Sequence, residues 1–394
     1  MSTILTNCNV INVENGEILD NASIGIKDRK IVSVGQRNEY DFRSRIDLRG
    51  EFVLPGLFNV HNNLSNVFPF KNINLNESQG ETVLRCYGEA LKALRAGVTT
   101  LRTMGEINRA DLVLKKAINN GVVAGPRIIA SGKGLGVTGG HGSGLGQTEA
   151  DTPDEFRKAA RKELAMGADH LKIFITGGIA NKEETFEEPQ MSQADMEAVV
   201  SVANSKGTYV GAHAGSSNPI MTAVKAGVRS IEHAYVLDID TAIAMKESGC
   251  VLVPTLSVTR SPVWMKDHNF ENWTIEKALS AGETHLRSIR TAVEQGVVIG
   301  NGTDLPPGDL NDGVVTTVRE IQFLHEAGLS NVEAIKAATI NSAKLCRLSS
   351  EVGLVKENYF ADLITVPRNP LKDLKELENI QFVMKDGQVV RNDI

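Results

Sequence analysis

The sequence predicts an α/β fold: a (β/α)8 TIM barrel with a small β-sandwich domain formed by the N- and C-terminal segments. Inside the 394-residue chain, eight short apolar runs alternate with longer stretches of helical periodicity. This alternation is typical of parallel βαβ units, and eight such units close a barrel. Both ends of the chain lack helical stretches. We therefore expect a discontinuous small β domain over residues 1–50 and 355–394 and a barrel over residues 51–354.

The barrel strands follow from the short runs of β-branched residues. In chain order they cover residues 52–61, 98–103, 127–131, 170–176, 208–213, 230–233, 251–256 and 297–304. Helices between them have recognisable starts, where Thr152 precedes Glu155 and where Ser192 precedes Asp195. Glycines close before the strands suit left-handed helix ends; they are Gly97, Gly167, Gly207, Gly227, Gly249 and Gly296.

The two ends contain short strands and turns, over residues 3–34 and 362–390. Gly16 and Gly387 stand in the turns at 14–16 and 385–387. Because no helix separates these strands, we predict that the two ends pair into one β domain.

The composition predicts a cytoplasmic protein whose partner is a small molecule. No apolar run approaches the roughly 18 residues of a membrane span, and the N-terminus does not resemble a signal peptide. The four cysteines stand far apart without a CxxC pair, which argues against disulfides and a thiolate zinc site. The net charge of −6 comes without a basic stripe, so we expect neither nucleic acid nor a membrane as partner.

Lys172 is the most informative single residue, because it is a lone lysine inside an apolar strand. Burial would lower its pKa and leave a neutral amine. A neutral amine can add carbon dioxide to form a carbamate, an anion that can bridge metals. The alternative is a lysine whose stem is buried and whose ammonium reaches solvent at the barrel end.

Four further residues fall at the carboxyl ends of predicted strands, where barrel enzymes place their functional groups. They are His61, His213, His233 and Asp304. A single histidine is more often a structural residue, but three imidazoles, a carboxylate and a buried lysine together predict a metal site.

Asn63 belongs to the same site, because strand alternation points residues 61 and 63 to one face. Its amide oxygen is a weaker and harder ligand than an imidazole. A metal held there would bind less tightly, or would be manganese or iron(II) instead of zinc.

The order of these residues resembles the amidohydrolase superfamily, specifically its imidazolonepropionase-like branch with Xaa-Pro dipeptidases. The resemblance covers nearly the whole chain. Its motifs are Leu54-Pro55-Gly56 before His61, residues 96–100 (AGVTT), residues 138–142 (TGGHG), Lys172, residues 212–214 (AHA), residues 231–233 (IEH) and residues 302–304 (GTD).

The resemblance implies a centre of one or two divalent metals, with zinc expected first. His61 and Asp304 would hold the first metal, carboxylated Lys172 would bridge, and His213 with His233 would hold the second. A metal-activated hydroxide would attack an amide carbonyl, while Asp304 acts as general base and then as general acid. Members often form dimers, so further copies of the chain are also expected partners.

The motif DxHxH of the family reads Asn59-Val-His61-Asn-Asn63 here, so two amides replace an acid and a histidine. One metal would then be held strongly and the other weakly or not at all. His141 resembles a substrate-contacting histidine of the family, or is an exposed loop residue. Tyr235 would orient the scissile carbonyl or pack at the barrel rim.

Arg260 is a further candidate, since it could pair with a substrate carboxylate; the alternative is a solvated loop residue. The leading hypothesis is metal-dependent hydrolysis of an amide bond in a dipeptide, N-acyl amino acid or cyclic amide. The alternatives are a one-metal enzyme acting on another C–N bond, by deamination, imine hydrolysis or rearrangement, and a family member that binds a ligand without catalysis.

Overall fold

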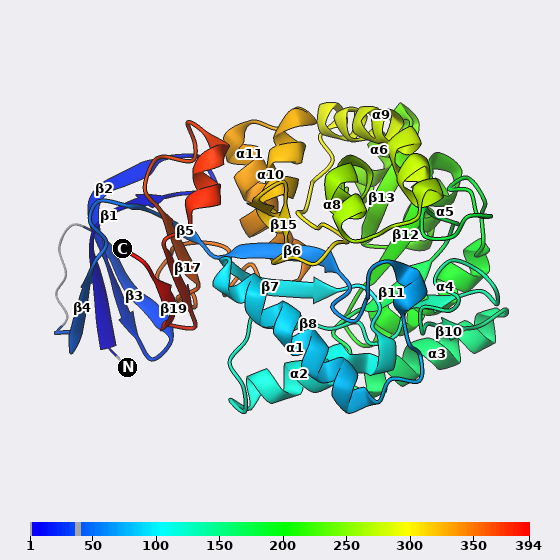
Figure 1. Cartoon of the computed structure of the whole chain (residues 1–394), viewed down its shortest axis with the longest axis horizontal. Coiled ribbons are helices and arrows are strands. Elements are labelled where there is room, and N and C mark those ends of the chain that lie inside the picture. Colours follow the sequence, from blue (N-terminus) through cyan, green and yellow to red (C-terminus); the bar gives the residue numbers. More distant parts are fainter. Residues whose placement is uncertain (1, 36–40) are drawn as a thin grey trace.

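The computed structural model describes residues 2–35 and 41–394, and its two ends meet in one sheet beside a larger α/β part (Figure 1). The sheet has eight strands in the order β19-β18-β17-β5-β1-β2-β3, and β4 pairs with β1. Their bounds are β1 Ser2–Ile11, β2 Ile18–Lys27, β3 Lys30–Gly35, β4 Ser44–Asp47, β5 Phe52–Pro55, β17 Leu363–Val366, β18 Phe382–Lys385 and β19 Gln388–Asn392. Gly16 and Gly387 have positive φ angles of 79° and 73°, as the predicted turns require.

Parallel strands form the second part, in a three-stranded and a six-stranded sheet. The first has the order β6-β7-β8 and the second β10-β9-β11-β12-β13-β14. Their bounds are β6 Leu57–Asn62, β7 Val98–Thr103, β8 Arg127–Ile129, β9 Leu135–Gly136, β10 Thr148–Glu149, β11 Leu171–Phe174, β12 Val210–Ser216, β13 Ser230–Val236 and β14 Val251–Val253.

The predicted strand over 52–61 is wrong as a single element, because it divides at Gly56. Residues before Gly56 form β5, which pairs with β1 and β17 in the terminal sheet, whereas β6 pairs with β7. A Cβ atom on Gly56 would lie 2.2 Å from Thr99 Oγ1, so the chain passes here only without a side chain.

The predicted strand over 297–304 is also wrong as a regular element, since only Ile299 makes a bridge, to Leu252. The backbone N–H of Asn301 donates to Ser342 Oγ, and Asp304 has a left-handed φ of 53°. The segment nevertheless lies against β6, where the backbone N–H of Asp304 donates to the His61 carbonyl over 2.8 Å.

Helices cover the parallel strands, and the two predicted caps are confirmed. Thr152 caps α3 and Ser192 caps α4 through a capping box. The six glycines before strands all have positive φ angles, between 68° and 105°. The helices are α1 Gln79–Arg95, α2 Ala110–Asn119, α3 Pro153–Ala165, α4 Gln193–Ser205, α5 Ser217–Ala226, α6 Ile239–Ser248, α7 Ser257–Arg260, α8 Pro262–Asp267, α9 Asn272–Gln295, α10 Thr316–Glu326, α11 Asn331–Lys336 and α12 Ser342–Leu345.

The carboxyl ends of the parallel strands carry the polar residues that the sequence singled out, while the strand interiors pack against the helices through a continuous apolar core. A hairpin of β15 Leu310–Asn311 and β16 Val314–Val315 follows Asp304. Among the described residues, no helix is both long and apolar enough to cross a membrane.

Candidate metal centre

The structure brings the predicted ligands together from β6, β11, β12 and β13 and from the segment that carries Asp304. His61, Lys172, His213, His233 and Asp304 all line one pocket. The ring centroid of His233 lies 4.9 Å from that of His61 and 4.5 Å from that of His213. Ligand atoms of His61, His233 and Asp304 lie within 4.8 Å of one another, which is close enough for a shared ion.

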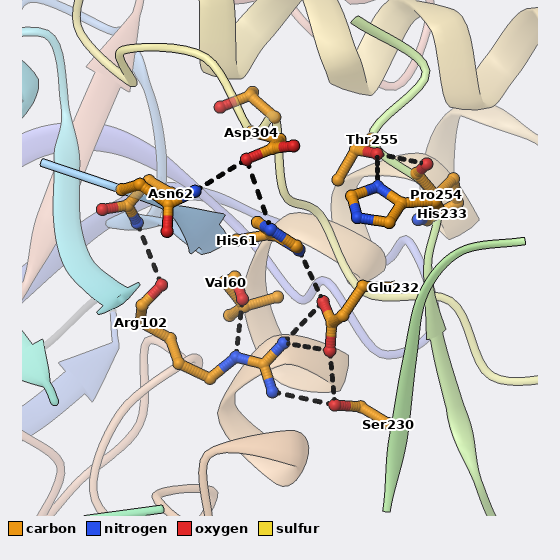
Figure 2. Close-up of polar contacts among 12 residues, drawn as sticks. Val60, His61, Asn62, Arg102, Ser230, Glu232, His233, Pro254, Thr255 and Asp304 are labelled. Carbon is orange, nitrogen blue, oxygen red and sulfur yellow. Dashed lines mark hydrogen bonds and ion pairs between the residues drawn. The ribbon is translucent and has the colours of Figure 1, made fainter. Parts of the chain in front are cut away.

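His61 is oriented by a buried carboxylate. Its Nδ1 lies 2.8 Å from Glu232 Oε2, and because a carboxylate only accepts, Nδ1 carries the proton. The lone pair is then on Nε2, which faces Asp304 Oδ1 at 3.4 Å (Figure 2). This is the tautomer that a metal ligand needs.

Glu232 is itself held by a fully buried arginine from β7. Arg102 Nη2 donates to both carboxylate oxygens over 2.8 and 2.9 Å, and Ser230 Oγ donates to Oε1 over 2.6 Å (Figure 2). Burial alone would raise the pKa of Glu232, but Arg102 and His61 outweigh it and hold that pKa well below its ordinary value. Glu232 therefore stays ionised and keeps His61 in one tautomer.

His213 and His233 are fixed in the same way by backbone and hydroxyl oxygens. His213 Nε2 donates to the Gly177 carbonyl over 3.0 Å, which leaves the lone pair on Nδ1. The Thr255 hydroxyl donates a hydrogen bond to the Pro254 carbonyl and accepts one from His233 Nδ1 over 2.6 Å. This leaves the lone pair of His233 on Nε2. Burial lowers the pKa of both rings well below the ordinary value, so both are neutral.

Lys172 lines the same pocket and is 1% exposed. Burial lowers its pKa from 10.5 to about 8, although Glu232 and Asp304 oppose the shift. Its Nζ lies 5.0 Å from the centre of the Phe174 ring. The prediction of a buried lysine with a depressed pKa is confirmed, and the alternative of an ammonium in solvent is wrong.

The donor set fits a divalent metal. Each of the three imidazoles has one ring nitrogen bonded to an oxygen acceptor, which leaves the other ring nitrogen available to a metal, and the Asp304 carboxylate stands beside His61. Imidazole with carboxylate suits zinc, iron(II) or manganese better than magnesium or calcium.

Comparison with known proteins accounts for this arrangement. The model of the amidohydrolase family matches residues 52–390. The chain belongs to this family. It is an amidohydrolase of the imidazolonepropionase-like and dipeptidase-like branch, a hydrolase of carbon–nitrogen bonds, and its α/β fold is of the type found in that family.

Several relatives of this amidohydrolase are named or solved. Ochratoxinase of Aspergillus niger is 29% identical over 95% of this chain and 84% of its own. Imidazolonepropionase of Kosmotoga olearia is 23% identical over 96% of this chain and 93% of its own. A crystal structure of a Xaa-Pro dipeptidase with bound methionine is 31% identical, covers both chains fully and has a TM-score of 0.91.

Asn63 stands where the amidohydrolase motif has a histidine, and here its amide nitrogen donates to Asp304 Oδ1 over 2.7 Å. It thus contacts a ligand by its N–H group, and its role as a metal ligand stays a prediction. Asn59 points away from the site and donates to Thr303 and Thr317 over 2.8 and 3.0 Å. It ties β6 to the segment that carries Asp304.

Of the two other predicted catalytic residues, His141 lines the metal pocket and the adjoining cavity, whereas Tyr235 lines only the adjoining cavity. His141 stacks on His213 with ring centroids 4.1 Å apart, and its Nδ1 lies 2.6 Å from Glu184 Oε2. Tyr235 stacks parallel to His233 at 5.4 Å and is 2% exposed. Arg260, in contrast, pairs with Glu326 over 2.5 Å and lines neither the metal pocket nor the cavity beside it.

Sequence reasoning missed the residues that hold the ligands. Arg102, Glu232, Thr255 and Glu184 each contact a ligand or its supporting group, but they come from different strands and loops. Only Glu232 could have been found, since it is a carboxylate inside a buried strand and directly precedes His233.

Proposed function

We propose that this amidohydrolase hydrolyses an amide bond in a small substrate with a divalent metal centre, zinc first and manganese or iron(II) as alternatives. The observation that carries the proposal is the orientation of His61, His213 and His233. One ring nitrogen of each histidine is hydrogen-bonded to a fixed oxygen acceptor, which leaves the other ring nitrogen available to a metal. Purely structural histidines have no need of three such lone pairs facing one buried space.

Lys172 is proposed to be carboxylated. The neutral amine attacks carbon dioxide, a new N–C bond forms and the released proton goes to water, which leaves an anionic carbamate among the imidazoles. A permanent cation at this 1% exposed position would be costly next to neutral rings. His61 and Asp304 would hold one metal, His213 and His233 would hold a second, and carboxylated Lys172 would supply oxygen ligands to this centre.

The catalytic roles follow from position. A bound divalent metal supplies a water of lowered pKa and polarises the substrate carbonyl. Asp304, whose side chain is 26% exposed, is placed to take the proton of the attacking water and to pass it to the leaving nitrogen. We propose that His141 contacts the substrate and that Tyr235 orients the scissile carbonyl. Burial, with Asp304 adding, raises the pKa of Tyr235 well above its ordinary value, so its hydroxyl remains a donor.

We also infer that the two parallel sheets and the segment 297–304 close into a (β/α)8 barrel. The segment pairs with Leu252 of β14, and its backbone donates to the carbonyl of His61 in β6. On the other side, the backbone N–H of Asp169, before β11, donates to the carbonyl of Ala130, just after β8. These backbone contacts support closure on both sides of the six-stranded sheet.

A one-metal enzyme acting on another C–N bond is the second candidate, and the contact of Asn63 with Asp304 favours it. An amide N–H that donates to a carboxylate oxygen weakens that oxygen as a metal ligand. The first metal position, at His61 and Asp304, would therefore bind its metal less tightly than the second. Deamination or imine hydrolysis would then replace amide hydrolysis.

The test is a substrate panel with the wild-type protein and two lysine variants. Dipeptides, N-acyl amino acids, cyclic amides and amino-substituted heterocycles are incubated, and amine or ammonia release is measured. We expect amine release from an amide, lost with a chelator and in Lys172→Ala but kept in Lys115→Ala, whose lysine pairs with Asp169. Amide turnover that survives chelation would overturn the proposal. Binding without any turnover would leave the non-catalytic alternative.

A further inference from the structure

A second cavity opens directly beside the metal centre, on the side of Tyr235. It shares Phe70, His141, Ala180, His213 and Asp304 with the metal pocket. One small substrate could therefore place its carbonyl at the metal centre and an attached group in this cavity.

The walls of this cavity are aromatic and aliphatic. We call it the aromatic chamber; its walls beyond the shared residues include Phe68, Val258, Met265, Phe270 and Leu305. They come from the loop after β6, from α7, from α8 and its following loop, and from the loop after Asp304. None of these loops belongs to the barrel core, so the chamber is built by the segments that vary a pocket without altering the strands.

The rings are packed against one another, which fixes the shape of the walls. Phe68 stacks on Phe270 with centroids 5.6 Å apart and meets Trp264 edge to face at 5.2 Å. Trp264 in turn stacks on His268 at 3.9 Å. Such pairs hold the walls in place before a ligand arrives, so little ordering cost is left for binding.

The charges around the chamber select against an anionic group. Asp304 is the acidic residue of its lining, and the described lining residues include neither lysine nor arginine. Arg260, two residues after Val258 on α7, pairs with Glu326. A carboxylate in the chamber would face Asp304 without a partner, whereas an uncharged ring would meet rings and methyl groups.

We propose that the aromatic chamber binds an uncharged group of benzyl size attached next to the scissile bond, so that the substrates are amides carrying an aromatic or large aliphatic group. The inference rests on the proposed function, because it places that group relative to the metal centre. The proposal concerns only this group of the substrate, and the side chains that would contact the group are Phe68, Val258, Met265 and Phe270.

Burial of a phenyl group in such a site should strengthen binding on the order of tenfold to a hundredfold over a methyl group. The test compares the binding of 3-phenylpropanamide and propanamide to the protein as purified, by calorimetry. We expect the phenyl compound to bind at least about tenfold tighter. Equal affinities would overturn the inference.

Val258→Trp fills the chamber and provides the second arm, with Val263→Trp as its matched control on the exposed side of α8, where Val263 is 48% exposed. The phenyl preference should disappear in the first variant and remain in the second. If Val258→Trp does not fold, Val258→Phe takes its place. A preference kept in a folded filling variant would place the phenyl group elsewhere and contradict the inference.

Turnover separates this inference from the proposed function. If the phenyl preference is found but neither amide is hydrolysed, the chamber stands and amide hydrolysis fails. If amides are hydrolysed with the same kcat/KM for small and aromatic members, hydrolysis stands and the chamber fails.

Discussion

Replacement of Glu232 by glutamine should disable the metal centre without touching a proposed ligand. In the wild-type protein, Glu232 Oε1 accepts from Arg102 and Ser230, and Oε2 accepts from Arg102 and His61. Glutamine has only one oxygen. Arg102 and Ser230, which both donate to Oε1, will keep the oxygen of the glutamine on their side. Its NH2 group will then face His61 Nδ1. His61 must then accept at Nδ1 and carry its proton on Nε2, which removes the lone pair from the pocket.

The magnitudes follow from burial. Arg102 and Glu232 are both 0% exposed, and breaking a buried ion pair by removing one partner costs about 3–5 kcal/mol of unfolding free energy. The loss of a supporting contact to a metal ligand lowers metal affinity by about 10–100-fold. Both effects should appear in Glu232→Gln, while Arg102→Met combined with Glu232→Gln should recover part of the stability but none of the metal affinity.

The assay pairs denaturant unfolding of chelated protein, which removes the contribution of bound metal to stability, with a competition titration for zinc affinity. Glu163→Gln is the matched control, because Glu163 is also 0% exposed and bonded to an arginine, Arg109, but contacts no ligand. It should lose stability and keep metal affinity. Unchanged zinc affinity in Glu232→Gln would refute the tautomer argument.

Three further outcomes are expected. Because burial lowers the pKa of Lys172 to about 8, its neutral fraction rises as the pH passes through about 8, so metal reconstitution of chelated protein at a fixed concentration of dissolved carbon dioxide should accelerate between pH 7 and 9; a flat rate under that condition would contradict the carbamate. Thr255→Val removes the acceptor of His233 and should lower zinc affinity about tenfold, seen by the same titration; wild-type affinity would show that Thr255 does not set the tautomer. His141→Asn should reduce kcat/KM by about 10–100-fold with metal content unchanged, and Glu184→Gln should do so less; loss of metal in either variant would assign His141 to the metal instead.

The parallel strands and the clustering of the candidate ligands could be predicted because both leave local marks in the sequence. The caps at Thr152 and Ser192 and the glycines before strands are fixed by short-range backbone geometry. Lys172 stood out because a lysine is foreign to an apolar strand. The segment 297–304 could not be predicted correctly. The backbone N–H of Asn301 donates to the side chain of Ser342, some forty positions later, instead of to a neighbouring strand.

The support of the ligands could not be predicted for the same reason. Arg102 reaches Glu232 across 130 residues of sequence, and Glu184 reaches His141 across 43. Such pairs carry no spacing that a single sequence reveals. The chamber walls likewise come from separate loops and short helices, and their side chains form one cavity only when the fold brings them together.

The central claim is a metal centre built on His61, Lys172, His213, His233 and Asp304. The most direct test is metal per chain by elemental analysis, on protein purified without chelator, for the wild type and for Asn63→His. The account predicts at least one equivalent of zinc, manganese or iron in the wild type, and a rise toward two when the imidazole replaces the amide beside Asp304. No metal in either protein would contradict it.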